Sequence, residues 1–456
     1  MKRSFSNLNE YKEINKKLYH ATSINELKSI YKLHYFDHVN ISTCLNKYAK
    51  LNKSKLVDPF IYRLMNEMAY QIKNFKAQEI ANTLWSLATL GIKPIDLLIQ
   101  EINYKIKDFK AQEIANTLWS LATLNIKPKI MNLLIQEITY KVKDFNAQEI
   151  ANTLWSFATL NIKPKIMNLL VQEIIYKIKD FNAQNIANTL WSLATLGIKP
   201  KIMDLLVQEI NYKIETFNSQ NIANTLWALA TLGIKPQVID LLTNEIKFKI
   251  EKFNAQEIAN TLWSFATLNI KPKIIELLIQ EINYKIKDFT VQGITNTLWS
   301  FAVLDIFNDT FLQLLKLVNI DNMKELIQID YIYLYLKFEK LYPIHLNHYM
   351  ITDSKSSALH LDCAKHLKML NISFENEKEI NHLIVDICIE QYKIVIEVNG
   401  PSHYIDHEMI GPTVFKNRLL LKMGWHVLHV PYYIWNKLNT PEKLNYLTFL
   451  LNLHSI

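Results

Sequence analysis

The sequence predicts an α-solenoid of about seven 36-residue helical hairpins with degenerate caps, followed by a small α/β domain. The pentapeptide ANTLW occurs six times, and a seventh copy reads TNTLW. After a first interval of 34 residues, the spacing between copies is 36 residues every time. Such a period is typical of stacked supersecondary units. The tryptophans that mark the copies are Trp85, Trp119, Trp155, Trp191, Trp227, Trp263 and Trp299.

Each copy reads as two helices. In the copy at residues 145–180, apolar residues at helical spacing run through AQEIANTLWSFATL. Asn161, or Gly197 in the next copy, is expected to end this first helix. The proline of each Ile-Lys-Pro (Pro164, Pro200) is expected to open the second helix. Because one hairpin cannot bury its apolar face alone, the copies must stack around a continuous core.

The flanks of the array suggest atypical copies that close the stack. Residues 36–51 align without gaps on the first helix of the repeat, and beyond Leu304 the pattern decays through a tyrosine-rich stretch. The predicted array therefore covers residues 35–340. Residues 1–34 form an N-terminal segment, which begins with the basic, acid-free MKRSFSNLN and is a candidate targeting region.

Composition excludes several classes of protein. No apolar run approaches the roughly 20 residues that a membrane helix needs. Three scattered cysteines, Cys44, Cys363 and Cys388, do not make a disulfide or zinc framework. The net charge of +8 is a moderate bias toward polyanionic partners.

The chain changes character after the array, since ten of its thirteen histidines lie from His345 onward. Residues 341–380 are predicted as a connecting helical segment and residues 381–456 as an α/β domain. The expected helices are residues 357–370 and 413–423, and the expected strands are residues 382–389, 393–398 and 425–431.

Two carboxylates are expected to converge in this domain. If Glu390 and Gln391 form a two-residue hairpin turn, Asp386 faces Val395 and stands diagonal to Glu397 on one sheet face. Converging carboxylates repel unless a metal or a proton neutralises one, so the pair is a candidate Mg²⁺ site that could activate water. His403 is a candidate ligand or general base. The alternative is a surface acid that bonds backbone amides, and His426 and His429 are given no role.

The residues around this pair resemble a RAP domain, an RNA-binding module named for its abundance in apicomplexan parasites. The resemblance covers about the last 70 residues through YKIVIEVNGPSHY and KNRLLLKMGWHVLHVPYYIW, with Arg418 on a basic helix. The family is similar to the very-short-patch-repair type of restriction-endonuclease fold. Asp386 and Glu397 match the two acidic positions of the nuclease pattern and His403 matches a common histidine. Asn399 departs from it, because active relatives usually have Asp or Lys there.

The resemblance therefore implies a fold kept for RNA binding without a cofactor, with a Mg²⁺-dependent RNA endonuclease as the alternative. Helical hairpins upstream of a RAP domain also resemble the octotricopeptide and heptatricopeptide repeat proteins and the FAST-kinase-domain family. These families act on organellar RNA.

An amide stripe on the first helices independently predicts RNA binding. A helical projection places Gln78 and Asn82 on the arc opposite Ile80 and Leu84. Amides carry donors and acceptors that suit the edges of unstacked bases. The same two positions recur in every copy: Gln112 and Asn116, Gln148 and Asn152, Gln184 and Asn188, Gln220 and Asn224, Gln256 and Asn260, Gln292 and Asn296.

Lysines on the second helices, such as Lys105 and Lys107 or Lys141 and Lys143, are predicted to meet phosphates. Alternatives stay open for the repeat residues. The asparagines could form a ladder between helices, and the lysines could be a solvated face. The tryptophans are interpreted as interlocking core residues, with base stacking as the alternative.

Discrimination between bases must come from positions that vary. One residue after the Gln, the copies carry Glu79, Glu113, Glu149, Asn185, Asn221, Glu257 and Gly293. Two residues before it, they carry Lys76, Lys110, Asn146, Asn182, Asn218, Asn254 and Thr290. We expect these residues to tune base preference along the strand.

Together these features predict an organellar protein that binds single-stranded RNA and serves the processing, stabilisation or maturation of ribosomal RNA or mRNA. The expected compartment is mitochondrial, with plastid as the second choice. The Asn-, Lys- and Ile-rich amino-acid composition resembles that of proteins encoded by an AT-rich genome, as in apicomplexans. The alternatives are the endonuclease and a protein-binding helical scaffold.

Overall fold

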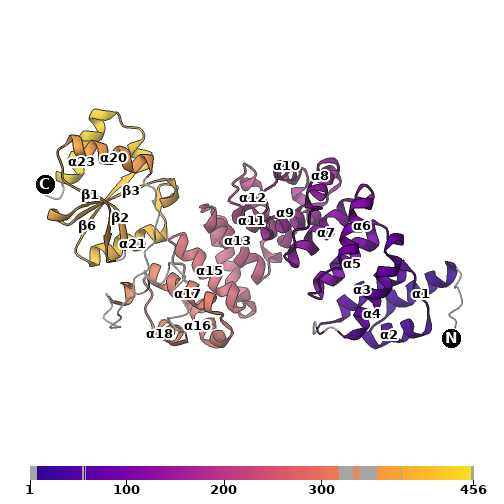
Figure 1. Ribbon diagram of the computed structural model, residues 1–456. Coiled ribbons are helices and arrows are strands. Elements are labelled where there is room, and N and C mark those ends of the chain that lie inside the picture. Colours follow the sequence, from indigo (N-terminus) through magenta and orange to yellow (C-terminus); the bar gives the residue numbers. More distant parts are fainter. Residues whose placement is uncertain are drawn as a thin grey trace. The chain divides into compact units, whose positions relative to one another are not determined.

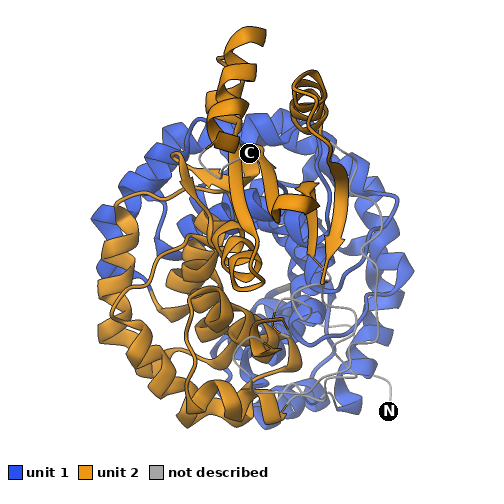
Figure 2. Cartoon of the chain, turned by 90° about the vertical axis from the view of Figure 1, so that its left-hand side faces the viewer, with its two compact units in different colours: residues 1–217 blue, residues 218–456 orange. Residues whose placement is uncertain are grey.

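The structure is a computed structural model, and it describes residues 8–53, 56, 58–317, 332, 334–337, 357–381 and 383–452. Paired helices are followed by a small mixed sheet (Figure 1). The chain divides into two compact units, residues 1–217 and 218–456, which Figure 2 colours separately. Across the described ranges, no helix has the length and apolar character needed to cross a bilayer. The predicted fold class, a helical solenoid followed by an α/β domain, is confirmed.

The first unit contains six hairpins. Within it, the first helix of each hairpin packs against the first helix of the next. The first helices are α1 (Leu8–His20), α3 (His38–Leu51), α5 (Ala77–Thr89), α7 (Ala111–Thr123), α9 (Ala147–Thr159) and α11 (Ala183–Thr195). The second helices are α2 (Ile24–Leu33), α4 (Pro59–Gln71), α6 (Asp96–Lys105), α8 (Met131–Lys141), α10 (Met167–Lys177) and α12 (Met203–Lys213).

The described residues of the second unit form three more hairpins and the sheet domain. Its first helices are α13 (Ser219–Thr231), α15 (Ala255–Thr267) and α17 (Val291–Val303), and its second helices are α14 (Val238–Lys249), α16 (Ile275–Lys285) and α18 (Asp309–Leu317). A single 3-10 turn follows each second helix from α4 to α16, as at residues 106–108 after α6.

Burial explains why this sequence stacks. Ile80, Leu84 and Leu87 on α5 are completely buried, as are their counterparts on the first helices from α7 to α15. Phe75, just before α5, is also fully buried, so the recurring phenylalanine belongs to the core between hairpins. Each fully buried side chain of this size contributes about 1.5–3 kcal/mol. The core therefore runs along each series of first helices.

In the seven copies that carry the recurring tryptophan, the turn inside the hairpin depends on one residue with positive φ. Asn161 (φ 50°) and Gly197 (φ 62°) occupy this position, as predicted. The Asn161 amide donates to the Ala158 carbonyl and the Ile162 amide to the Phe157 carbonyl, which is a Schellman motif. The prediction that proline opens the second helix is wrong by three residues: Pro164 sits in a turn, and α10 starts at Met167.

The sheet has the strand order β1 (Glu375–Ile380), β2 (Leu383–Ile389), β3 (Ile394–Asn399) and β6 (His426–Pro431). β2 is antiparallel to β1 and β3, whereas β6 is parallel to β3. One sheet face packs with α20 (Ala358–Met369) and α23 (Thr440–Asn452) in an apolar core. α21 (Gly411–Lys422) contacts β6, α22 (Tyr432–Trp435) follows β6, and β4 (Tyr404–Ile405) pairs with β5 (Glu408–Met409).

Helices and strands also occur outside the predicted boundaries. Residues 8–33 form α1 and α2, and α1 packs on α3 as the later first helices pack on one another. Residues 375–380, assigned to a connecting helical segment, form the edge strand β1 instead. Of the stretch 318–356, where the array is predicted to decay, only residues 332 and 334–337 lie within the described part of the chain.

Candidate nucleic-acid interface

The amide stripe lies on the surface of the first helices. In all seven copies the glutamine is exposed and the asparagine is half-buried. Within each unit, no side chain of the stripe hydrogen bonds to a neighbouring repeat, and Gln292 bonds only to Asn296 of its own helix (3.3 Å). The described residues therefore do not form an asparagine ladder. The amides remain available for a ligand.

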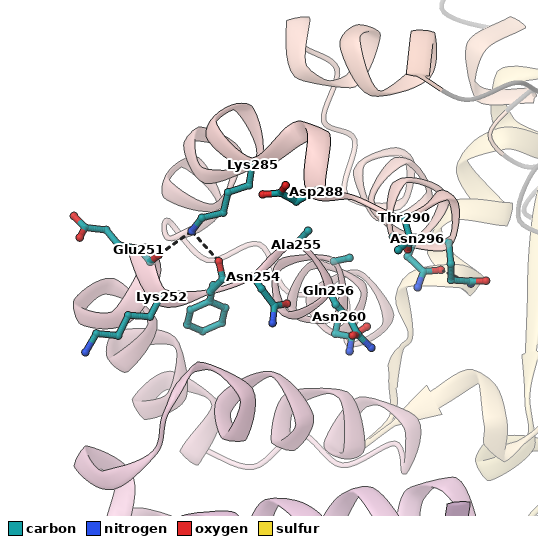
Figure 3. Close-up of a pocket in the computed structure, with 14 residues that line it drawn as sticks. Glu251, Lys252, Asn254, Ala255, Gln256, Asn260, Lys285, Asp288, Thr290 and Asn296 are labelled. Atoms are coloured by element: carbon teal, nitrogen blue, oxygen red, sulfur yellow. Dashed lines mark hydrogen bonds between the residues drawn. The ribbon is translucent and has the colours of Figure 1, made fainter. Parts of the chain in front are cut away.

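Pockets open between consecutive repeats beside this stripe. One pocket of about 510 Å³ is lined by Lys110 and Gln112 of one repeat and by Asn146 and Glu149 of the next. The equivalent pocket, four repeats later, has about 740 Å³. Its lining includes Asn254, Gln256, Asn260, Thr290, Gly293 and Asn296. Figure 3 shows Asn254, Gln256 and Asn260 at the start of and on α15, and Thr290 and Asn296 at the start of and on α17.

The two pockets have the same construction. Each combines the recurring glutamine of one repeat with the two variable positions of the following repeat. The variable positions are therefore next to the predicted base-binding amide, although they belong to a different helix. The smaller pocket has the Glu149 carboxylate in its wall, whereas the larger pocket has Gly293 at the equivalent position.

The variable residues also cap the first helices. Glu149 accepts a hydrogen bond from the Asn146 amide (2.8 Å), and the Asn146 side chain accepts one from the Glu149 amide (2.9 Å). Asn182 and Asn185 make the same reciprocal bonds (3.2 and 2.9 Å). This is a capping box in which Glu and Asn are interchangeable. Burial raises the pKa of Glu149, and the Glu113 carboxylate raises it further.

Tryptophan rings form a row in each unit. Ring centroids of Trp85 and Trp119 are 6.3 Å apart, and those of Trp119 and Trp155 are 6.4 Å apart. In the second unit, Trp263 stands 6.3 Å from both Trp227 and Trp299. The rings pack on one another, as expected for interlocking core residues, while all but Trp299 remain half-buried rather than buried.

The first lysine of each predicted pair joins two repeats. The Lys105 ammonium donates to the carbonyls of Lys73 (2.8 Å) and Phe75 and lies 3.3 Å from a Glu101 carboxylate oxygen. Lys141 makes the equivalent bonds, to the carbonyls of Lys107 (2.8 Å) and Phe109 (2.6 Å). These contacts occupy three N–H donors. The structure thus gives Lys105 and Lys141 a role different from the predicted phosphate contact.

The second lysine pairs with a buried carboxylate of the next repeat. Lys107 lies 2.5 Å from Glu137, whose side chain is only 4% exposed, while the lysine is 74% exposed. Burial acts to raise the pKa of Glu137, but the ammonium groups of Lys107 and Lys141 outweigh it and lower the pKa. Lys143 is exposed and stays a predicted phosphate contact.

We expect Glu137→Gln to destabilise the array by about 1–2 kcal/mol at pH 7, because two lysines lose their buried partner. A lowered pKa in the folded state means that the unfolded chain binds the proton more readily. The stability from Glu137 is therefore present above the ordinary glutamate pKa and lost as the pH falls below it. Thermal denaturation from pH 7 to pH 3 should show a smaller gap between variant and wild type as the pH drops. A constant gap would contradict the prediction.

In the sheet domain, the two predicted acidic residues face each other more directly than expected. The hairpin turn comprises residues 390–393 with Lys393 in the left-handed region (φ 51°), so Cys388, not Asp386, stands opposite Val395. The predicted register is thus wrong by two residues. A shift of two preserves the face of every side chain, and it brings Asp386 opposite Glu397.

An ammonium group neutralises one member of this pair, Glu397. Lys416 of α21 donates to both carboxylate oxygens of Glu397 (2.7 Å each). Asp386 accepts a hydrogen bond from the Val398 amide (2.7 Å), as in the alternative interpretation of an acid that bonds backbone amides. Burial raises the pKa of Glu397 against the opposing charge of Lys416, and Asp386 raises it further.

Other polar side chains surround the pair. His403 lies 3.0 Å from the Thr413 hydroxyl, and Asn399 lies 2.9 Å from His429, which the β3–β6 register places opposite Glu397. Burial lowers the pKa of His403, and burial together with Lys416 and His403 lowers that of His429 to about 4. Thr413, Lys416 and His429 are site residues that the sequence did not indicate. For two of them the sequence does contain a usable signal, because Thr413 and Lys416 are three residues apart and therefore share one face of a helix.

These side chains do not fit the predicted Mg²⁺ site. Mg²⁺ needs several oxygen ligands, yet both oxygens of Glu397 bind Lys416 and one oxygen of Asp386 binds an amide. Within the described ranges, no three His, Cys, Asp or Glu residues are grouped to hold a metal ion. Lys416 supplies the positive charge that the sequence assigned to a metal or a proton.

Arg418 contacts protein in this structure. Its guanidinium donates to the carbonyls of Ala302 and Val303 at the C-terminal end of α17. Lys235, in the turn after α13, pairs with Glu408 of β5 (2.7 Å). Cations are favoured at a helix C-terminus, where unpaired carbonyls carry partial negative charge. Arg418, predicted to bind RNA, thus joins the sheet domain to the last repeats.

Comparison with known families agrees with both parts of the chain. A family model described as RAP domain matches residues 396–448. A second family model, described as RNA-editing substrate-binding complex 6 protein, matches residues 20–309, which is more than half of the chain. No curated protein matches the sequence. Both family matches support the RNA-binding role predicted from the sequence. The chain belongs to the RNA-editing substrate-binding complex 6 protein family and carries a RAP domain at its C-terminal end.

Proposed function

We propose that the repeat array binds single-stranded RNA and that each pocket between two repeats holds one base. The observation that carries this proposal is the shared construction of the two pockets, in which a recurring glutamine meets the variable pair of the next repeat. The recurring amide would bind any base edge, and the variable residues would decide between bases.

The chemistry of the pockets supports a preference that changes along the strand. Glu149 offers only acceptors, so its pocket favours bases with an amino or imino group at the exposed edge. In the larger pocket, Thr290 and Gly293 replace Asn146 and Glu149, and no carboxylate stands at that position. This pocket would accept a larger base or one that presents acceptors.

The substitution Glu149→Asn tests the proposal without disturbing the cap, because Asn185 already makes the same capping bond in the next repeat. Sequencing of RNA selected from a random pool should show a changed base preference at one position. The expected discrimination is about 1–3 kcal/mol, as for other side-chain contacts to a base edge. Gln112→Ala should weaken binding without shifting the preference.

Glu276→Asn is the matched control, since it removes the same charge from an exposed position of α16 outside both pockets. It should leave the selected sequence unchanged. An identical selected sequence for Glu149→Asn and wild type would contradict the role of the variable residues. RNA binding should also weaken steeply as salt rises, whereas a peptide-binding scaffold would show no such dependence on phosphate contacts.

We further propose that the bound RNA is an organellar transcript, ribosomal RNA or mRNA, whose maturation or stability depends on this protein. The name of the family, which refers to RNA-editing substrates, and the basic N-terminal sequence support a mitochondrial location, with plastid as the second choice. Sequencing of RNA crosslinked to the protein in its native cells tests this. A footprint restricted to nuclear-encoded transcripts would contradict it.

A further inference from the structure

A second row of exposed side chains runs along the other helix of the hairpin. The second helices α6, α8, α10 and α12 of the first unit each carry a tyrosine at the same repeat position. Tyr104, Tyr140, Tyr176 and Tyr212 are 75%, 67%, 80% and 76% exposed. Tyrosines so exposed bury little apolar surface within the fold. Recurring exposed aromatic groups mark a surface that meets a partner.

A lysine from the preceding repeat accompanies each tyrosine. The ammonium groups of Lys73, Lys107 and Lys179 lie 5.0, 5.2 and 4.9 Å from the ring centroids of Tyr104, Tyr140 and Tyr212. These distances are those of cation–π contacts. The three lysines are 74–76% exposed although each also pairs with a buried glutamate. Three of the four repeat steps therefore present an aromatic ring and a cation in contact.

At the third step, that of Tyr176, this surface is hollowed. Lys143 and Tyr176 line a groove of about 720 Å³ together with Leu169, Gln172, Glu173 and Ile175. A volume of this size accepts a small ligand or one nucleotide. The groove combines an aromatic ring, an apolar floor, an amide and a cation, which are groups that suit a base and its phosphate. Its one carboxylate, Glu173, lies 3.6 Å from the Lys177 ammonium.

We infer that the tyrosine row, Tyr104, Tyr140, Tyr176 and Tyr212 with their lysines, binds single-stranded RNA. Bases stack on the tyrosine rings, and the lysines contact the adjacent phosphates. Neighbouring hairpins lie about 10 Å apart, several times the 3.4 Å step of stacked bases, so the strand must be unstacked to meet successive rings. Stacking accepts every base, so this row adds affinity and the pockets add discrimination.

The charge pattern favours RNA over a protein partner. Lysine occupies the accompanying position at 73, 107, 143 and 179, but glutamate replaces it at Glu215 and Glu251. Aromatic residues nevertheless continue as Phe248 and Tyr284, which are 77% and 83% exposed. If the rings made only apolar contacts with a protein, the charge beside them would not matter. The lysines beside the first four rings therefore favour an anionic partner at those rings. The lysine-bearing part of the row lies entirely in the first unit.

The experiment uses the full chain and a fluorescein-labelled oligouridine of about 30 nucleotides. Replacing the four tyrosines by alanine should weaken binding about tenfold or more, measured by fluorescence anisotropy. Replacing the same four by phenylalanine should keep affinity within about twofold, because the ring is retained. The lysines are left intact, since Lys73, Lys107 and Lys179 also pair with a buried glutamate between repeats.

The matched control is the double variant Phe248→Ala/Tyr284→Ala, which removes equally exposed rings that follow a glutamate. It should bind oligouridine as the wild type does.

Because the inference rests on the proposed RNA-binding role, Gln112→Ala is measured in the same assay as the four-alanine variant. If the four-alanine variant binds normally while Gln112→Ala weakens binding, the tyrosine row is not an RNA surface and the proposed function stands. If the wild type binds no RNA, both are overturned. Normal RNA binding with loss of a co-purifying protein would assign the row to a protein partner.

Discussion

Glu397→Gln should destabilise the RAP domain by about 3–5 kcal/mol, the largest effect that we expect from a single substitution in this chain. The carboxylate is 7% exposed and holds the 19% exposed ammonium of Lys416 by two bonds of 2.7 Å. Glutamine leaves that ammonium inside the domain without its counter-charge, close to two histidines that already have lowered pKa values. Thermal denaturation followed by calorimetry measures the loss.

Two further variants isolate the ion pair. Glu390→Gln removes a carboxylate of the same domain that is 66% exposed and pairs with Lys378, so it should leave the denaturation temperature close to that of the wild type. The double variant Glu397→Gln/Lys416→Met should recover much of the lost stability, because no unpaired charge remains buried. Equal effects of Glu397→Gln and Glu390→Gln would contradict the structural role of the pair.

The same variants distinguish the ion pair from a metal site. If Glu397 bound Mg²⁺, the ion would stabilise the folded wild type in proportion to its occupancy and would lose this effect in Glu397→Gln. We expect Mg²⁺ to leave the denaturation temperature of both unchanged. A rise seen only in the wild type would show that Lys416 yields its place to a metal, and it would revive the endonuclease alternative.

Much of the array was predictable because its local signals repeat. Phe75 and its successors, the apolar positions of the first helix and the positive-φ residue at Asn161 or Gly197 each have one physical explanation, and all keep the same period. α1 and α2 lack the recurring tryptophan and were therefore assigned to a separate N-terminal segment. β1 was missed because Glu375–Ile380 reads ENEKEI, a mostly exposed edge strand without apolar alternation.

The candidate sites were predictable only within a single element. A helical projection finds the exposed glutamine and half-buried asparagine of α5, since both belong to one helix. It cannot show that Lys105 reaches the carbonyls of the previous repeat, or that Glu149 lines a pocket with Gln112. Lys416 was missed for the same reason, because its partner Glu397 lies 19 residues away on a strand.

Gly411→Ala should detach α21 from the last repeats and cost about 3 kcal/mol or more in the second unit. A β-carbon at Gly411 would lie 1.7 Å from the Ala266 carbonyl oxygen at the end of α15 and 2.9 Å from a Val303 methyl group. A backbone carbonyl cannot move aside cheaply, so α21 must shift, and Arg418 must release the carbonyls at the end of α17. Limited proteolysis and thermal denaturation should both report the change.

Gly400→Ala is the matched control, because a β-carbon there meets no atom within 4 Å and the backbone φ of −74° suits alanine. It should change stability by no more than about 0.5 kcal/mol. The contacts of α21 lie near the C-terminal ends of α15 and α17, whereas Gln256 and Gln292 lie near their N-terminal ends. Gly411→Ala should therefore leave the RNA sequence selected by the repeats unchanged. If Gly411→Ala alters that sequence, the docked RAP domain takes part in recognition, and if it matches Gly400→Ala in stability, the close contact with Ala266 does not form.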